Sequence, residues 1–128
     1  MQRNLKVLLI KPNKLPKVIN IKNTLEEKQK QVGGYIEYTY LENCDDVAII
    51  CNEEGKVLGL PPNRDVGHDI IMGDFLIVGD DAEIGEDRSL TDNQIKKYKK
   101  MFDEKTIIKT ENEINKLAKN NLVDEFSL

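Results

Sequence analysis

A lone histidine and one of the two cysteines are the side chains in this chain best suited to catalysis. His68 is followed by Asp69, a pairing that suggests a general base. Neighbouring residues of an extended chain point in opposite directions, so Asp69 would not orient His68. Cys51 could pair with His68 as a nucleophile, but it follows the apolar run Val47–Ile50, where a buried thiol behaves as a small hydrophobic group. We therefore predict no catalytic residue, and an enzyme is the least favoured function.

Metal and cofactor chemistry is not indicated either. Neither cysteine has a Cys or His neighbour at metal-ligand spacing, and the run Asp80–Glu83 lacks the glycine and regular ligand spacing of a calcium loop. Gly33 and Gly34 follow a predicted helix, whereas phosphate-binding glycines precede one. We expect the two glycines to end that helix, and we predict no metal and no cofactor.

The strongest candidate for recognition is the proline-rich stretch Pro61–Asp65. Two prolines stiffen it, and Arg64 offers a planar fork suited to a carboxylate or phosphate. We expect an exposed Arg64-centred pocket for a small anionic ligand such as a nucleotide, built between subunits and lined by Tyr35, Glu37, Asn63, Arg64 and Asp65. The alternative is structural: Arg64 pairs with a local acid such as Asp65 or Glu53 and staples the loop.

A second candidate is an acidic segment near the end of the apolar core strands. It spans residues 80–92 and contains one basic residue, Arg88. Its acidic residues are Asp80, Asp81, Glu83, Glu86, Asp87 and Asp92. Such a run is either a solvated loop or an acidic contact surface for a basic protein partner.

Composition excludes several classes of protein. The net charge is −4, aromatic residues make up 5% and there is no tryptophan, so nucleic-acid binding is not expected. No apolar run approaches the roughly 20 residues that span a membrane. Two thiols without a predicted partner, and no signal peptide, suggest a reducing cytoplasm.

The order of predicted elements indicates one α+β domain over residues 1–103. Strands are expected at residues 5–10 and 17–21, paired as a hairpin. A helix follows, opened by a capping box at Thr24–Glu27, with Leu25, Lys28, Gln29 and Val32 on its buried side. Next come a strand at 35–41, a turn at 43–46, a central strand at 47–51, a hairpin turn at 52–55 and a return strand at 56–60. The apolar stretches 70–72 and 75–78 complete a mixed or antiparallel sheet of β-β-α-β-β-β order, for which a β-grasp-like arrangement is a candidate.

Two C-terminal helices are expected beyond the sheet. One spans residues 90–103 and opens with a capping box at Thr91–Gln94; Ile95, Tyr98, Met101 and Phe102 recur at helical spacing. The other starts at Thr110, within an extension over residues 104–128, and is amphipathic. It either docks on the domain or pairs with another copy, which would make the protein a homo-oligomer.

Several runs of residues resemble those of the family known as domain of unknown function 3846. The most specific block leads from Asn-Glu-Glu-Gly to Pro-Pro-Asn-Arg, and the matching runs are Val7–Pro12, Val32–Glu37, Ile50–Lys56, Leu58–Arg64, Ile70–Gly79 and Ser89–Thr91. The resemblance covers roughly residues 5 to 103. It brings no catalytic residues, and the link from Arg64 to Ile70 is shorter than such proteins often have.

The resemblance implies an accessory protein of a phage, plasmid or other mobile element. We therefore expect a non-catalytic binding protein, an accessory or anti-defence factor that binds a host protein. The alternatives are a small-ligand or nucleotide-sequestering protein and, last, an uncharacterised enzyme.

Overall fold

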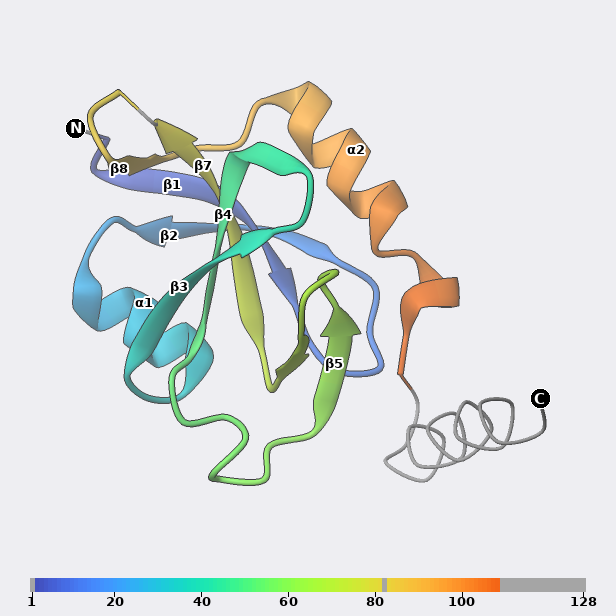
Figure 1. Ribbon diagram of the computed structural model, residues 1–128. Coiled ribbons are helices and arrows are strands. Elements are labelled where there is room, and N and C mark those ends of the chain that lie inside the picture. Colours follow the sequence, from blue (N-terminus) through green and yellow to red (C-terminus); the bar gives the residue numbers. More distant parts are fainter. Residues whose placement is uncertain (1, 82, 109–128) are drawn as a thin grey trace, which may run out of the picture.

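The centre of the fold is a six-stranded sheet in which every strand pair is antiparallel. The computed structural model describes residues 2–81 and 83–108. Its strands run in the order β2-β1-β7-β4-β3, and β8 pairs with β7 outside this path (Figure 1). The bounds are β1 (Asn4–Ile10), β2 (Lys17–Lys22), β3 (Ile36–Leu41), β4 (Cys44–Asn52), β7 (Phe75–Asp81) and β8 (Glu86–Arg88). The α+β class and the antiparallel sheet are confirmed; the β-grasp-like detail stays a prediction.

Each face of the sheet buries its own apolar cluster. On one face, α1 (Leu25–Val32) covers a cluster that includes Val7, Leu76 and Val78. On the other, α2 (Asp92–Met101) covers one that includes Ile49, Phe75 and Ile77. Strand β4 lies between β7 and β3, which confirms the central position predicted for residues 47–51.

Helix α1 begins and ends as its sequence indicates, but it buries different residues. Thr24 accepts a hydrogen bond from the Glu27 amide at 3.2 Å, and Gly33 ends the helix at φ 78°, where glycine is favoured. The Glu27 carboxylate accepts from Gln31 at 3.2 Å, where the capping box predicted a bond to the Thr24 amide. Lys28 and Val32 are buried, whereas Leu25 is 57% exposed, so its predicted place on the buried side was wrong.

Helix α2 confirms its predicted capping box. The Thr91 hydroxyl accepts from the Gln94 amide, and the Gln94 side chain accepts from the Thr91 amide. Tyr98 and Phe102 are buried against the sheet, while Met101 is 37% exposed. A short 3-10 helix, η1 (Glu104–Thr106), follows. The helix predicted from Thr110 lies outside the described residues.

Two predicted connections are placed differently by the structure. The turn expected at 43–46 lies at Glu42 and Asn43, because Asn43 adopts a positive φ of 63° and Cys44 already pairs with Leu41. A turn does occur at 52–55, where the Gly55 amide donates to the Asn52 carbonyl at 3.2 Å. The return strand at 56–60 was wrong, because residues 53–59 form a turn-rich loop. Val57 is 86% and Leu58 57% exposed. With no sheet surface beneath them, their apolar side chains do not favour a strand.

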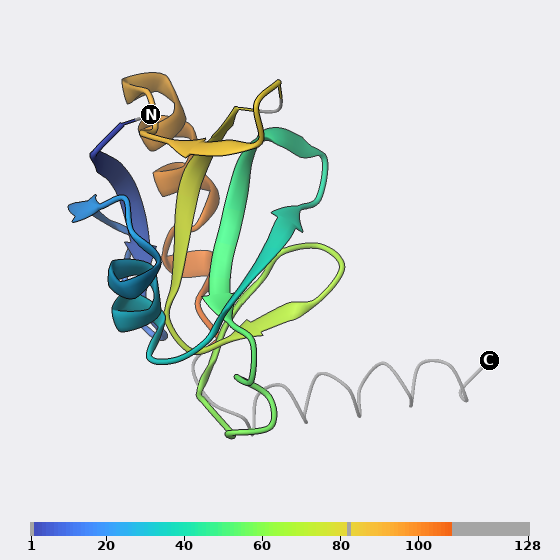
Figure 2. The ribbon, with the colours of Figure 1, turned by 90° about the vertical axis from the view of Figure 1, so that its left-hand side faces the viewer.

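The stretch after this loop forms a separate hairpin. Strand β5 (Pro62–Asp65) pairs with β6 (Ile70–Met72) in a second, two-stranded sheet. The hairpin lies beside the end of β3 (Figure 2), where the Glu42 amide donates to the Val66 carbonyl at 3.1 Å. The loop expected around Arg64 is therefore a strand from Pro62 onward, in which Pro62, Asn63 and Arg64 are buried and Asp65 is exposed.

Candidate functional site

Arg64 lies in the interior of the protein. Both Arg64 and Asn63 are 0% exposed. The Arg64 guanidinium donates to Thr106 Oγ1 at 2.8 Å, to Asn63 Oδ1 at 2.9 Å and to the Lys14 carbonyl at 2.6 Å. The expected exposure of Arg64 was therefore wrong, and the staple considered as its alternative has different partners from the acids Asp65 and Glu53.

These bonds tie together three segments that are distant in sequence. Besides Asn63 on β5, Arg64 reaches the β1–β2 loop through Lys14 and the chain after α2 through Phe102 and Thr106. Burial lowers the pKa of Arg64, and the nearby charge of Asp103 partly offsets this effect. The neighbouring Asn63 amide donates to the carbonyls of Ile10 and Gly73.

The other residues of the predicted pocket lie apart from one another. Tyr35 is 65% exposed and lines a hollow at the end of α1. Glu37 lines a separate cleft. Asp65 is exposed, and its carboxylate accepts from the Gly67 amide at 2.8 Å. The five residues therefore do not form a single pocket around Arg64.

His68 and Cys51 line the same cleft, of about 280 Å³, but their surroundings do not favour nucleophilic chemistry. Desolvation, followed by the charges of Glu37 and Asp69, raises the pKa of the Cys51 thiol to about 11. His68 Nε2 lies 3.1 Å from Thr39 Oγ1, and its ring stacks on Tyr40 with centroids 4.0 Å apart. Asp69 binds Lys56 Nζ at 2.6 Å. Cys51 is thus a protonated thiol at neutral pH, and no carboxylate hydrogen bond to His68 occurs among residues 2–81 and 83–108.

No group of three or more potential metal ligands gathers among the described residues. Nor does any helix in this part of the chain combine the length and the apolar composition of a membrane span.

A hollow lies beside β3, and we call it the acidic groove. Its volume is about 640 Å³. Tyr38 and Tyr40 of β3 and Lys28 of α1 line it together with the acidic residues Asp80, Glu86 and Asp87. Both tyrosines are about half exposed, Tyr38 49% and Tyr40 57%.

Part of the acidic segment is paired as a hairpin of β7 and β8. Strands β7 and β8 place Asp80 directly opposite Asp87, and Asp81 opposite Glu86. Like charges in directly opposed positions destabilise a sheet. Of the predicted acidic surface, Glu83 lies in the exposed turn of this hairpin.

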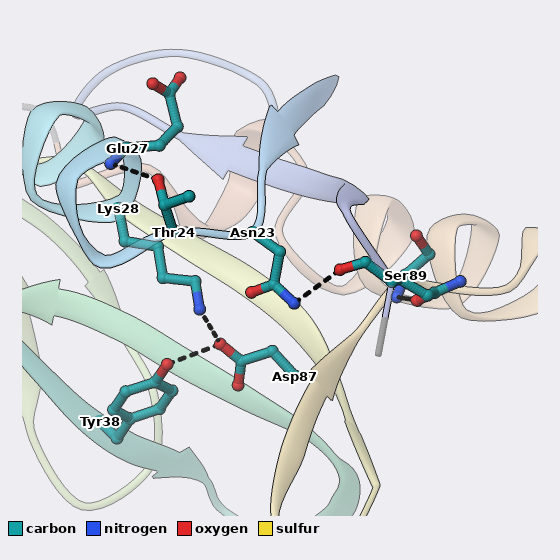
Figure 3. A network of polar contacts seen from close by, with 8 residues as sticks. Asn23, Thr24, Glu27, Lys28, Tyr38, Asp87 and Ser89 are labelled. Carbon is teal, nitrogen blue, oxygen red and sulfur yellow. Dashed lines mark hydrogen bonds and ion pairs between the residues drawn. The ribbon is translucent and has the colours of Figure 1, made fainter.

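One cation partly compensates these carboxylates. Lys28 Nζ and the Tyr38 hydroxyl both donate to Asp87 Oδ2, each at 2.6 Å (Figure 3). Desolvation, then the hydrogen bond to Asp87, raises the pKa of Tyr38. The Lys28 and Asp87 side chains are only 10% and 11% exposed. No cationic side chain pairs with Asp80 or Glu86 among the described residues, so the groove carries uncompensated negative charge.

Comparison with known families agrees with the resemblance seen in the sequence. The family model described as "domain of unknown function (DUF3846)" matches residues 5–103. The chain belongs to the DUF3846 family. Neither the curated proteins nor the solved structures provide a match to this DUF3846 chain.

In this DUF3846 protein, the sequence indicated the acidic part of the groove but not its walls. Lys28 was expected on the buried side of its helix, without a partner. Tyr38 and Tyr40 were assigned only to a strand. The spacing Tyr38-Thr39-Tyr40 does place both rings on one face, a signal that could have marked them.

Proposed function

We propose that this protein is a non-catalytic binding protein that holds a basic segment of another protein in the acidic groove. The observation that carries the proposal is the pairing of Asp80 with Asp87 across the β7–β8 hairpin, inside a hollow of about 640 Å³. A cation placed between these carboxylates would relieve a repulsion that the folded chain otherwise retains. The binding of a basic side chain would thus be favoured by charge and by shape.

The tyrosines support the same class of ligand. An arginine or lysine side chain is attracted to the face of an aromatic ring, and its aliphatic stem covers apolar surface. Tyr38 offers such a ring beside the carboxylates, and Tyr40 offers the ring face that His68 does not cover. Asp87 also has a second oxygen, Oδ1, to which no described residue donates, since Lys28 and Tyr38 both contact Oδ2.

Nucleotide sequestration is supported less well. Its proposed anchor, Arg64, has its donors directed at protein acceptors and is 0% exposed. The acidic groove would repel a phosphate. A basic host protein as partner fits the accessory role in a mobile element that the family resemblance suggests, and that role stays a prediction.

A peptide titration with charge-matched variants tests the proposal. The probe is an oligolysine peptide, with an oligoglutamate peptide as control, measured by fluorescence anisotropy at low and near-physiological salt. The groove variant is Asp80→Asn with Glu86→Gln. The matched control is Asp45→Asn with Glu104→Gln, two exposed carboxylates outside the groove. Both double variants change the net charge from −4 to −2.

We expect the groove variant to bind oligolysine about three- to tenfold more weakly than the control variant, as for the loss of two partly screened ion pairs. Equal affinities for the two double variants would show that only overall charge matters and would reject the groove. Tighter binding of oligoglutamate would reject the proposal outright.

A further inference from the structure

The two outer strands of the main sheet differ in how well they are protected against pairing. Strand β2 follows Pro16 and carries Lys17 and Lys22, features that discourage the addition of another strand. Strand β3 has neither proline nor lysine, and its only charged residue is Glu37. The edge formed by β3 is therefore the one open to a further strand.

The main-chain groups on that edge can be assigned from the pairing with β4. The Tyr35 carbonyl accepts from the Glu53 amide at 2.9 Å, and Ile36 lies opposite Asn52 in the next pair. Hydrogen-bonded and non-bonded pairs alternate along antiparallel strands. Ile36 and Tyr38 therefore direct their N–H and C=O groups away from β4, and β3 has no strand partner other than β4 among the described residues.

We propose that β3 pairs with β3 of a second copy of this chain, antiparallel and centred on Tyr38. The edge then joins two sheets into one, across a twofold axis at Tyr38. Such an interface is isologous, as in most homodimers. This inference does not depend on the acidic groove binding a basic segment.

Charge disfavours the register shifted toward Glu37. Centring on Tyr38 places Ile36 opposite the partner's Tyr40, and Glu37 opposite the partner's Thr39. A shift that centred the pair on Glu37 would place two glutamates directly opposite, which is unfavourable. The Tyr38 register pairs apolar and aromatic residues on one face and leaves no like charges opposed within the strands.

The structure also limits the length of this interface. The edge closes at Glu42, whose amide already donates to the Val66 carbonyl. A short pairing gains few contacts against the entropy lost on association, so we expect a concentration-dependent dimer rather than an obligate one. The acidic grooves of the two copies would lie on the same face of the joined sheet, so added salt should strengthen the dimer.

Substitution at Thr39 tests the register directly. In the proposed pairing, residue 39 lies opposite Glu37 of the partner subunit. Thr39→Lys would therefore add an attractive charge pair, and Thr39→Glu a repulsive one. Each dimer contains two such pairs, in close non-hydrogen-bonded positions. We expect Thr39→Lys to lower the dimer dissociation constant by about two- to thirtyfold relative to wild type, and Thr39→Glu to raise it by a similar factor.

Sedimentation equilibrium over a wide concentration range measures these constants. Both variants lose the contact of Thr39 with His68, so urea unfolding establishes that each is folded. Amide exchange gives a second readout: Tyr38 should become protected as the wild-type concentration rises, whereas Glu37, already bonded to β4, should not change. The proposal would be overturned if the two variants changed the dissociation constant in the same direction. It would also be overturned if both wild type and Thr39→Lys were monomeric at every concentration.

Discussion

Replacement of Arg64 by methionine should be among the most damaging single substitutions in this protein. The guanidinium makes three hydrogen bonds of 2.9 Å or shorter, to Lys14, Asn63 and Thr106. Hydrogen bonds to a charged group contribute about 1.5–3 kcal/mol each, and they are not additive. Methionine keeps much of the side-chain volume but leaves these acceptors without their donor. We expect a loss of about 3–5 kcal/mol, the range found when a buried charged network is broken.

Urea unfolding followed by circular dichroism measures this loss. A domain of this size unfolds with a slope of about 1–3 kcal/mol per molar urea, so the midpoint should fall by roughly 2 M. Arg3→Met is the matched control, because Arg3 is exposed; we expect it to change stability by less than about 0.5 kcal/mol.

A third variant separates charge from geometry. Arg64→Lys keeps the positive charge but cannot reach Lys14, Asn63 and Thr106 with one planar fork. It should recover only part of the loss. The reasoning would be refuted if Arg64→Met lowered stability by no more than Arg3→Met.

Three further predictions concern other buried or opposed groups. Cys51, with its pKa raised to about 11, should not react with a thiol reagent at pH 8 until urea unfolds the protein; reaction of native Cys44→Ser protein would contradict this. Although desolvation opposes it, hydrogen bonds from Tyr98 and Gln94 lower the pKa of Asp46, so its carboxylate stabilises the fold above about pH 4 and this contribution disappears as pH falls further. Asp46→Asn should therefore cost about 1–2 kcal/mol at pH 7 and flatten the acid limb of the stability profile, measured by urea unfolding from pH 2 to 7. Asp80→Asn should raise stability by about 0.2–1 kcal/mol, because it removes the repulsion from Asp87; a lower melting temperature would count against that repulsion.

Local patterns predicted much of the fold. The helix starts at Thr24 and Thr91, the glycine that ends α1 and the apolar run of β4 each depend on residues close in sequence, and each was placed correctly. Only the Thr91 start forms the full capping box. The return strand predicted at residues 56–60 was wrong, because alternation of apolar side chains indicates a strand only where a sheet surface exists to bury them. Val57 and Leu58 have none.

The candidate site was harder to predict because it depends on contacts between distant segments. In the sequence alone, Arg64 has the features of a ligand-binding arginine. In the fold, the chain after α2 and the β1–β2 loop surround it with oxygen acceptors. In the sequence alone, the acidic segment has the composition of a solvated loop. In the fold, β8 pairs with β7 and places Asp80 directly opposite Asp87. Lys28 lies 59 positions from Asp87 in sequence, and no local pattern predicts that ion pair.

The most direct test of the proposed function is the location of the bound basic peptide. Titration of the isotopically labelled protein with oligolysine, followed by amide chemical shifts, gives that location residue by residue. We predict the largest shifts at Tyr38, Tyr40, Asp80, Glu86 and Asp87, with saturation. Largest shifts in the cleft of Lys56 and His68, or small shifts spread over all acidic residues without saturation, would contradict the acidic groove as the binding site.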